Sequence, residues 1–343
     1  MKWVKPGYSA VTPAVSEEGI LYFVISDTRL YALDTATGLL KWQKNISGGI
    51  GTALALDEVR GQLYFGTGYP SIVALDQQTG EYKWSFPTQH GDKDQSNPSV
   101  GPDGTVYAGS RNGHVYAFDP ETGVVKWELQ AEHPVFAQPV INDRGMILVG
   151  EYVLDINDGH KLWQCTDDWW YLNYGNWIVG DGGIHLFPDN RNLMAIDPAT
   201  GQKSWQISPG AEIRGLTAVN NDRIYFGMGD GTVCAVDGQT GAIAWRYPTT
   251  SSMMGVAPAF GPGGLIYIPG NDGTLYALQT SSTGLAGSAW PTYRRDSFGR
   301  GCLPQTPRLV EEPQPQVVKA GSPLELCVSV NGQQPLSYTA AHN

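Results

Sequence analysis

Apolar and polar residues alternate over short stretches along most of the chain, and turn-forming residues separate these stretches. In "GPDGTVYAGSRNGHVYAFDPETGVVKWEL", residues 101–129, the segments "PDG", "RNG" and "DPETG" each stand between two alternating runs. Alternation with a period of two predicts strands, and Gly-containing and Asp-containing turns between them predict hairpins. This unit therefore predicts four antiparallel strands, each joined to the next by a turn.

The same unit recurs with a period near forty residues. The segment "YALDTATGLLKW" returns as "VALDQQTGEYKW", "YAFDPETGVVKW", "YVLDINDGHKLW", "MAIDPATGQKSW" and "CAVDGQTGAIAW". The tryptophans that end these copies, with successive spacings of 42, 43, 36, 42 and 40 residues, are Trp42, Trp84, Trp127, Trp163, Trp205 and Trp245. A repeat of this length that contains four strands predicts the blades of a β-propeller.

The inner strands predict the number of blades. Several of them carry a small residue followed two positions later by Pro, as in "VTPAV", "SNPSV", "AQPVI" and "VAPAF". The inner strands begin near Ser9, Ile50, Ser96, Ala137, Gly175, Gly215 and Gly255. We therefore expect an all-β fold, a seven-bladed β-propeller of four-stranded antiparallel blades over residues 1–300.

Two blades depart from the repeat. In the seventh, Gln279 replaces the Asp, and Gly284 and Trp290 come late, so this blade lacks a normal outer strand. The amino-terminal "MKWVKPG" is similar to the outer strands "YKWSFP" and "VKWELQ", which predicts that Trp3 pairs with the last blade and closes the ring. In the fourth blade, "GMILVGEYVLDINDGHKLW" is compressed, which predicts a shortened outer hairpin.

Composition and charge narrow the classes of partner. The chain has 343 residues, 43 Gly, 23 Pro and 16% charged residues, typical of a large turn-rich fold. Its net charge of -11 argues against nucleic acid, which binds basic surfaces. No apolar run approaches the roughly 18 residues that span a membrane, and "MKWVKPGYSAVTPAV" lacks the apolar stretch of a signal peptide. A signal for export would therefore lie outside this chain.

The cysteines give no metal or redox motif. They are scattered, without a CxxC pair and without a His cluster at zinc spacing. The four positions are Cys165, Cys234, Cys302 and Cys327.

The recurring skeleton Ala-x-Asp-x-x-x-Gly-x-x-x-Trp resembles the tryptophan-docking motif of the PQQ-like propeller repeat family. It is seen, for example, in Ala32, Asp34, Gly38 and Trp42. That family includes quinoprotein alcohol dehydrogenases and BamB-like assembly lipoproteins, and the resemblance covers about residues 1–300. It implies the propeller fold, but a fold does not fix chemistry, because function depends on the sites that each protein carries.

The repeated residues have a structural explanation. A flat indole on the outer strand can lie over the Gly turn of the next blade, where no Cβ obstructs it. Asp34 and its equivalents can accept hydrogen bonds from the backbone of the turn. We therefore interpret these tryptophans, together with Trp3, as structural docking residues.

The carboxyl-terminal region predicts two further segments. "PQTPRLVEEPQPQ" indicates a Pro-rich linker, at residues 301–315. "PQVVKAGSPLELCVSVNGQQPLSY" resembles the first strands of a bacterial immunoglobulin-like domain, at residues 316–343. A complete sandwich needs about 100 residues, so this immunoglobulin-like segment is expected to be incomplete in the chain.

The sequence predicts no catalytic residue and no metal ligand. Quinoprotein dehydrogenases need an Asp base, Glu and Asn ligands for calcium, and often an adjacent cysteine pair. This chain has no adjacent cysteines. Neither GxSxG nor HExxH occurs. "DKDQSN" partly resembles a calcium loop but lacks its Gly and its closing Glu.

Unusual residues gather in the links from each outer strand to the next inner strand, on the face where the central channel opens. These links include "TQHGDKDQ", "AEHPVF", "TDDWWYLNYGNW" and "GAEIRG". An aromatic side chain there can stack on a sugar or anchor a partner protein, and His and Asp can orient it. The expected binding residues are His90, Asp92, His133, Asp168, Trp169, Trp170, Tyr171 and Arg214. Alternatively, the three aromatic residues fill space beside the short fourth blade.

These observations favour a monomeric, non-enzymatic binding or assembly scaffold in an extracellular or periplasmic location, with a protein or carbohydrate at the channel mouth. The alternative that the family resemblance implies is an oxidoreductase that uses pyrroloquinoline quinone with calcium.

Overall fold

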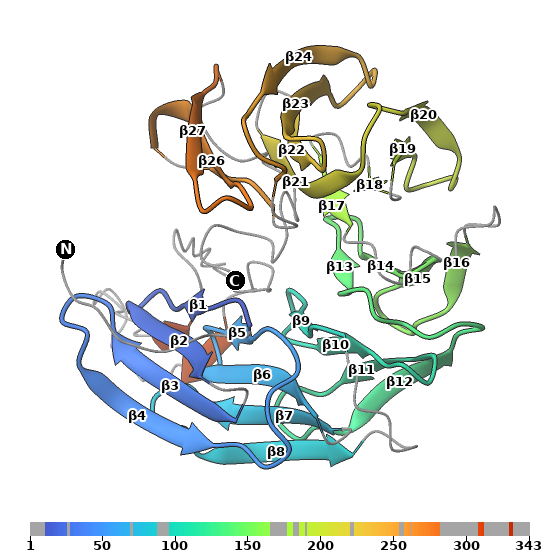
Figure 1. Cartoon of the computed structure of the whole chain (residues 1–343). Helices are drawn as coiled ribbons and strands as arrows, with labels where there is room; N and C mark the ends of the chain where they lie inside the picture. Colours follow the sequence, from blue (N-terminus) through green and yellow to red (C-terminus); the bar gives the residue numbers. More distant parts are fainter. Residues whose placement is uncertain are drawn as a thin grey trace, which may run out of the picture.

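Seven β-sheets follow one another around a ring in the computed structural model of the protein (Figure 1). The described residues are 11–25, 28–68, 71–87, 96–164, 177–180, 185–188, 191–219, 223–253, 257–260, 262–281, 308–311 and 329–331. No helix in these ranges has both the length and the apolar character needed to cross a membrane.

The first three sheets each contain four antiparallel strands in chain order. The first blade contains β1 (Ala14–Val15), β2 (Ile20–Ile25), β3 (Arg29–Asp34) and β4 (Leu40–Asn45). The second contains β5 (Ala55–Asp57), β6 (Gln62–Thr67), β7 (Ser71–Asp76) and β8 (Tyr82–Pro87). The third contains β9 (Ser99–Val100), β10 (Val106–Gly109), β11 (His114–Phe118) and β12 (Val125–Gln130).

The next three sheets have the same order. The fourth blade contains β13 (Val140–Ile141), β14 (Met146–Val149), β15 (Tyr152–Asp155) and β16 (Lys161–Gln164). The fifth contains β17 (Ile178–Val179), β18 (His185–Pro188), β19 (Leu193–Ile196) and β20 (Lys203–Ile207). The sixth contains β21 (Ile213–Val219), β22 (Arg223–Met228), β23 (Thr232–Asp237) and β24 (Ile243–Pro248).

The seventh sheet has three strands within the described residues. They are β25 (Ala259–Phe260), β26 (Leu265–Pro269) and β27 (Leu275–Gln279), with the 3-10 turn η3 (Pro262–Gly264) before β26. The predicted all-β propeller of four-stranded antiparallel blades is therefore confirmed for six blades. The expected closing strand around Trp3, together with Gly284 and Trp290, lies outside the described residues.

The turn between the third and fourth strands is built by its Asp, as expected. Asp34 Oδ1 accepts hydrogen bonds from the Thr37 backbone N at 2.8 Å and from Thr37 Oγ1 at 2.7 Å. These bonds hold the pKa of Asp34 below its usual value. The Thr bonds recur at Asp76, Asp119 and Asp237. The residue after this Thr has a positive φ, which is +73° at Gly38. Gly takes this conformation without steric cost.

A bulge then places the Trp of each outer strand on the face toward the next blade. The ladder between β3 and β4 shifts register after Ala32, which pairs with Trp42, and the other four-stranded blades shift at the equivalent residue. A bulge inserts one extra residue and turns the following side chains to the other face. Its position therefore determines where the indole points.

The docking indoles pack on the Gly turn of the following blade, wherever the structure describes both the Trp and that turn. Trp84 Nε1 donates to Pro120 O at 2.8 Å, and a Cβ added to Gly123 would lie 2.6 Å from the Trp84 ring. The same pairing joins Trp42 to Gly80, Trp127 to Gly159, Trp163 to Gly201 and Trp205 to Gly241. The apolar clusters likewise span neighbouring blades, as in the cluster of the second and third.

Tyrosines on the second strand share this contact, which the sequence analysis did not predict. Tyr22 OH donates to Gln77 O at 3.0 Å, and Trp42 Nε1 donates to the same oxygen at 2.8 Å. Tyr64 and Tyr107 bond in the same way to the carbonyl that accepts from their own blade's Trp. One carbonyl in the turn that follows each of the first three blades therefore receives two aromatic donors.

The fourth blade is shortened, as its compressed sequence predicts. Strands β14, β15 and β16 have four residues each, and Val149 pairs with Tyr152 across a two-residue turn, Gly150–Glu151. The outer hairpin of the first blade has six residues per strand. This short turn forms part of the candidate site below.

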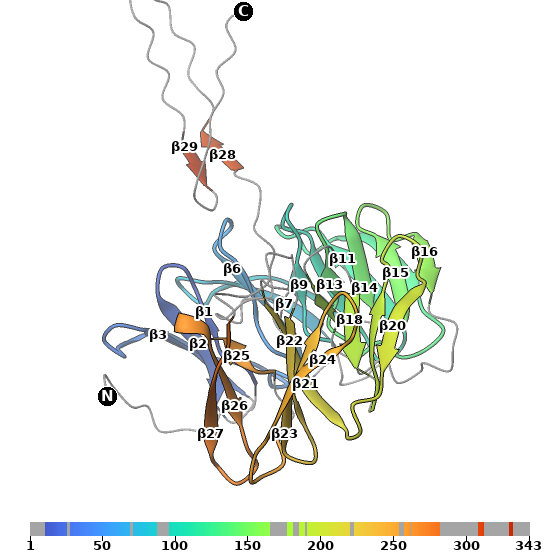
Figure 2. The same ribbon diagram turned by 90° about the horizontal axis from the view of Figure 1, so that it is seen from above.

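The carboxyl-terminal region contributes a two-stranded antiparallel ladder, β28 (Arg308–Glu311) with β29 (Ser329–Asn331). It lies outside the ring of blades (Figure 2). Strand β28 falls inside the segment expected to be a linker. The described residues of this region show no sandwich, and the immunoglobulin-like resemblance of residues 316–343 stays a prediction.

Candidate functional site

Two of the expected binding residues, His133 and Arg214, lie in the described part of the structure. The others lie outside it: His90, Asp92, Asp168, Trp169, Trp170 and Tyr171. Arg214 is the second residue of β21 in the sixth blade and pairs with Glu212, with 2.7 Å between Nη2 and Oε2. No hydrogen bond or ion pair between described residues joins Arg214 to His133. His133 precedes the fourth blade and Arg214 lies in the first strand of the sixth blade, so the two residues are two blades apart.

The link that carries His133 runs from β12 to β13 and is anchored to both blades. On the third blade, the backbone N of Ala131 donates to Gly113 O at 2.7 Å, and that of Val135 donates to Ser110 O at 2.9 Å. On the fourth blade, the backbone N of Glu132 donates to Tyr152 OH at 2.9 Å. The link therefore holds His133 beside the short turn of the fourth blade.

That turn contains a buried carboxylate, Glu151, which the sequence analysis missed. Its side chain is 6% exposed, and Oε1 lies 3.0 Å from His133 Nδ1. Gln164 Nε2, at the end of the outer strand, donates to the same oxygen at 3.3 Å. A charged residue in a two-residue turn was the available signal, but the sequence does not reveal which link covers it.

The following link returns to the same turn. Trp177, the last residue of "TDDWWYLNYGNW", is 1% exposed, and its Nε1 donates to Gly150 O at 3.1 Å. We call His133, Glu151, Tyr152, Gln164 and Trp177 the fourth-blade rim cluster. It joins the link before the fourth blade, the blade itself and the link after it.

The electrostatics of the cluster depend on Glu151. The hydrogen bond to Glu151, followed by the Coulomb attraction of the same carboxylate, raises the pKa of His133 above its usual value. Partial burial raises the pKa of Tyr152 to about 12, so its hydroxyl stays neutral. Lys161 Nζ lies 5.8 Å from the centroid of the Tyr152 ring, within range of a cation–π contact.

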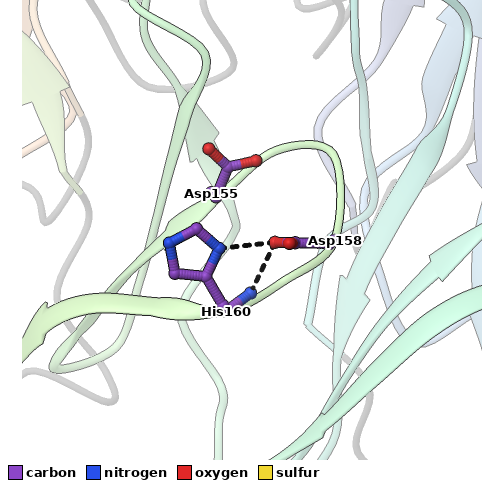
Figure 3. Close-up of side chains that lie close together, drawn as sticks. All are labelled: Asp155, Asp158 and His160. Atoms are coloured by element: carbon purple, nitrogen blue, oxygen red, sulfur yellow. Dashed lines mark hydrogen bonds and ion pairs between the residues drawn. The ribbon is translucent and has the colours of Figure 1, made fainter.

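A separate group of potential metal ligands lies at the other end of β15. Asp155 ends β15, and Asp158 and His160 follow in the turn before β16; the ligand atoms of the three residues lie within 4.8 Å of one another (Figure 3). Asp158 Oδ1 lies 2.6 Å from His160 Nδ1 and accepts a bond from the His160 backbone N at 3.0 Å. Glu151 precedes β15 and Asp155 ends it, so this group and the rim cluster lie on opposite faces of the ring.

Four-stranded blades that dock through a Trp, a Tyr and a Gly turn define a PQQ-like repeat propeller. The chain belongs to the family described as "Outer membrane protein assembly factor BamB", whose profile matches residues 1–99, 88–169 and 152–289. In fold, the chain is similar to BamB from Moraxella catarrhalis, with a TM-score of 0.63 and 18% identity, covering 80% of this chain and 86% of that one. A computationally designed protein, Ika8, is also similar, with a TM-score of 0.57 and 16% identity over 80% of this chain and all of that one.

Curated relatives share parts of the chain. The quinohemoprotein alcohol dehydrogenase ADH-IIG of Pseudomonas putida is 29% identical over 191 residues, 47% of this chain and 25% of the enzyme. The serine/threonine-protein kinase AfsK of Streptomyces griseus is 29% identical over 159 residues, 41% of this chain and 19% of the kinase. The chain therefore spans a quarter or less of the length of these two relatives.

Proposed function

We propose that the protein is a non-enzymatic binding or assembly scaffold that acts outside the cytoplasm, in the periplasm or the extracellular space. One contrast carries this proposal: the described repeat residues are engaged in contacts between or within blades, whereas the links that we expect at one mouth carry, in the sequence, charged and aromatic residues that the repeat does not require. Family membership adds support, because the family description names an assembly factor.

The proposed ligand at this mouth is a protein or a carbohydrate. Half-exposed His133 and Arg214 offer charged hydrogen-bond donors at the links. The aromatic run Trp169, Trp170 and Tyr171 leads into Trp177, whose indole is bound to the fourth blade. Aromatic side chains combined with orienting polar groups are typical of protein hot spots and of sugar-binding surfaces. We propose that the protein works as a monomer.

Changing the mouth is expected to abolish binding without unfolding the protein. In a double variant, Asp168→Ala with Trp169→Ala, we expect loss of partners in a pull-down from the native extracellular or periplasmic fraction, with an unchanged melting temperature. A glycan array with the same variant tests the carbohydrate option.

The matched control is Gln78→Ala with Glu81→Ala, two exposed residues in a turn on the opposite face. It should retain every partner. Equal retention by both double variants would overturn the proposed binding mouth, and a lower melting temperature of the first would assign Trp169 to filling space.

A second candidate function is oxidation with pyrroloquinoline quinone, favoured by the identity with the quinohemoprotein dehydrogenase. The residues fit it poorly. The chain has no adjacent cysteines, and Cys234 is buried with its pKa raised to about 11 by desolvation. The described group of close metal ligands lies at an outer turn, not on the inner strands. Calcium-dependent quinone binding with reduction of a dye would establish this function, and the scaffold proposal expects neither.

A further inference from the structure

We propose that His133 and Glu151 form a proton-operated latch, which fastens the link between the third and fourth blades and thereby regulates binding at the channel mouth. The latch rests on the proposed function for its biological role. Its chemistry rests on the geometry of the fourth-blade rim cluster alone.

The first argument is that Glu151 has few ways to offset its burial. Its side chain is 6% exposed, and among the described residues it is bonded to His133 Nδ1 at 3.0 Å and Gln164 Nε2 at 3.3 Å. A buried carboxylate is costly unless it is paired and hydrogen-bonded. The hydrogen bond from the Gln164 amide is long, and its donor is uncharged. Protonated His133 is therefore the stronger partner, because a charge-assisted hydrogen bond is about twice as strong as a neutral one.

The second argument is that the latch residues lie on separate elements. His133 belongs to the link, and Glu151 belongs to the turn that precedes β15. The neighbouring pair, the Glu132 backbone N and Tyr152 OH at 2.9 Å, joins the same two elements. Two adjacent link residues are thus held by two adjacent turn residues. Weakening one bond loosens the attachment of the link to the fourth blade.

The charges around His133 set the direction of the response. Glu151 faces it from the turn, Glu132 precedes it in the link, and both favour its protonated form. Tyr152 stays neutral, and Lys161 Nζ lies 5.8 Å from the centroid of the Tyr152 ring. Loss of the proton would leave buried Glu151 and nearby Glu132 without the cation that both attract.

The sign of the pH dependence follows. The folded-state pKa of His133 is raised, so the latch is fully formed below the ordinary His value of about 6.5 and weakens as the pH rises through the raised value. The neutral ring can still donate from Nδ1 in one tautomer, so the link loosens but is not released. We therefore expect tighter partner binding in mildly acidic than in alkaline solution.

The test is an NMR titration of the His133 ring in the whole chain, from about pH 5 to about pH 9. Glu151→Gln keeps the shape of the side chain and removes its charge. We expect this change to lower the pKa of His133 and to abolish the pH dependence of the protection factor of the Glu132 amide, its exchange rate relative to the intrinsic rate at the same pH. Asp158→Asn, beside His160 on the opposite face, should change neither.

An unchanged pKa of His133 in Glu151→Gln would overturn the latch. If Glu151→Gln does not fold, His133→Gln provides the second variant, and a protection factor at Glu132 that still varies with pH in it would also overturn the latch.

Partner binding separates the latch from the scaffold proposal. Binding that weakens with rising pH in the native chain, but not in His133→Gln, supports regulation. Binding that is independent of pH while His133 titrates would overturn the regulatory role alone. Failure to bind any protein or glycan at every pH would overturn the scaffold proposal, while the titration still decides the latch.

Discussion

Replacing Trp84 by Ala is expected to lower the free energy of unfolding by about 3–5 kcal/mol, the range for removing a large buried aromatic side chain. Trp84 is 8% exposed, and its indole donates to Pro120 O in the third blade. Tyr64 and Phe118 lie on either side, with ring centroids 5.7 Å and 5.9 Å away. The loss therefore affects two blades, and urea denaturation measures it. We expect a similar effect for Trp205→Ala.

A double-mutant cycle tests whether the Gly turn exists to receive the indole. Gly123→Ala adds a Cβ 2.6 Å from the Trp84 ring at a residue with φ +70°, so it carries both a clash and backbone strain. Gly61→Ala is the matched control, because φ is +61° and nothing lies within 4 Å. Strain alone costs about 1–2 kcal/mol.

We expect Gly123→Ala to cost clearly more than Gly61→Ala in the native chain and about the same in the Trp84→Ala background. Equal costs in the native chain would contradict the docking model. Ligand binding supplies a second check, since Trp84 should affect it only through folding. A Trp84→Ala protein that stayed fully stable but lost its ligand would make this tryptophan part of a binding site.

The sequence predicts the framework well because each blade repeats the same local chemistry. Asp34, Gly38 and Trp42 recur at fixed spacing, and each has a role that a turn or a neighbouring turn explains. Tyr22 was missed, because a Tyr in an alternating strand reads as one more core residue. Nothing local shows that its hydroxyl reaches Gln77, 55 positions away.

The rim was harder to predict, because its contacts depend on where the links fold. The sequence singles out His133, and the structure adds Glu151, Gln164 and Trp177 around it. These partners come from a turn, a strand end and the next link. They meet because the fourth blade is short. The compressed sequence predicts the short blade but not the contacts that it permits.

The junction between the first and seventh sheets differs from the junction between the first two blades in how far its apolar side chains are buried. Tyr22 faces the second blade, so Leu21, Phe23 and Ile25 face the seventh sheet, and all three are partly exposed. The equivalent Leu63 and Phe65 of the second blade are fully buried. In the seventh sheet, Ile266 and Ile268 pack on the sixth blade, and the alternate residues of β26 are partly exposed.

The described part of the seventh sheet has no fourth strand, and this explains the junction. In the other blades, the second-strand Tyr or Leu pairs with an Ala or Val of the third strand, which pairs with the docking Trp, as in Tyr22, Ala32 and Trp42. The seventh sheet has Tyr267 paired with Ala277, but Ala277 is exposed, whereas Ala32 is fully buried. We propose that Trp3 occupies the position opposite Ala277 and makes the seventh sheet a complete blade.

Trp3→Ala is therefore expected to lower the melting temperature by roughly 4–8 °C, from a loss of about 3–5 kcal/mol in a chain of this size. Lys2→Ala, next to it in the same segment, is the matched control and should have little effect, because surface substitutions usually do. The proposed register also places Lys5 opposite Leu275, by analogy with Lys44 and Leu30 in the first blade. Cysteines at those two positions should form a disulfide, since paired strand residues lie within about 4.5–5.5 Å. Melting of Trp3→Ala at the temperature of the native chain, with no cross-link between residues 5 and 275, would show that another segment closes the ring.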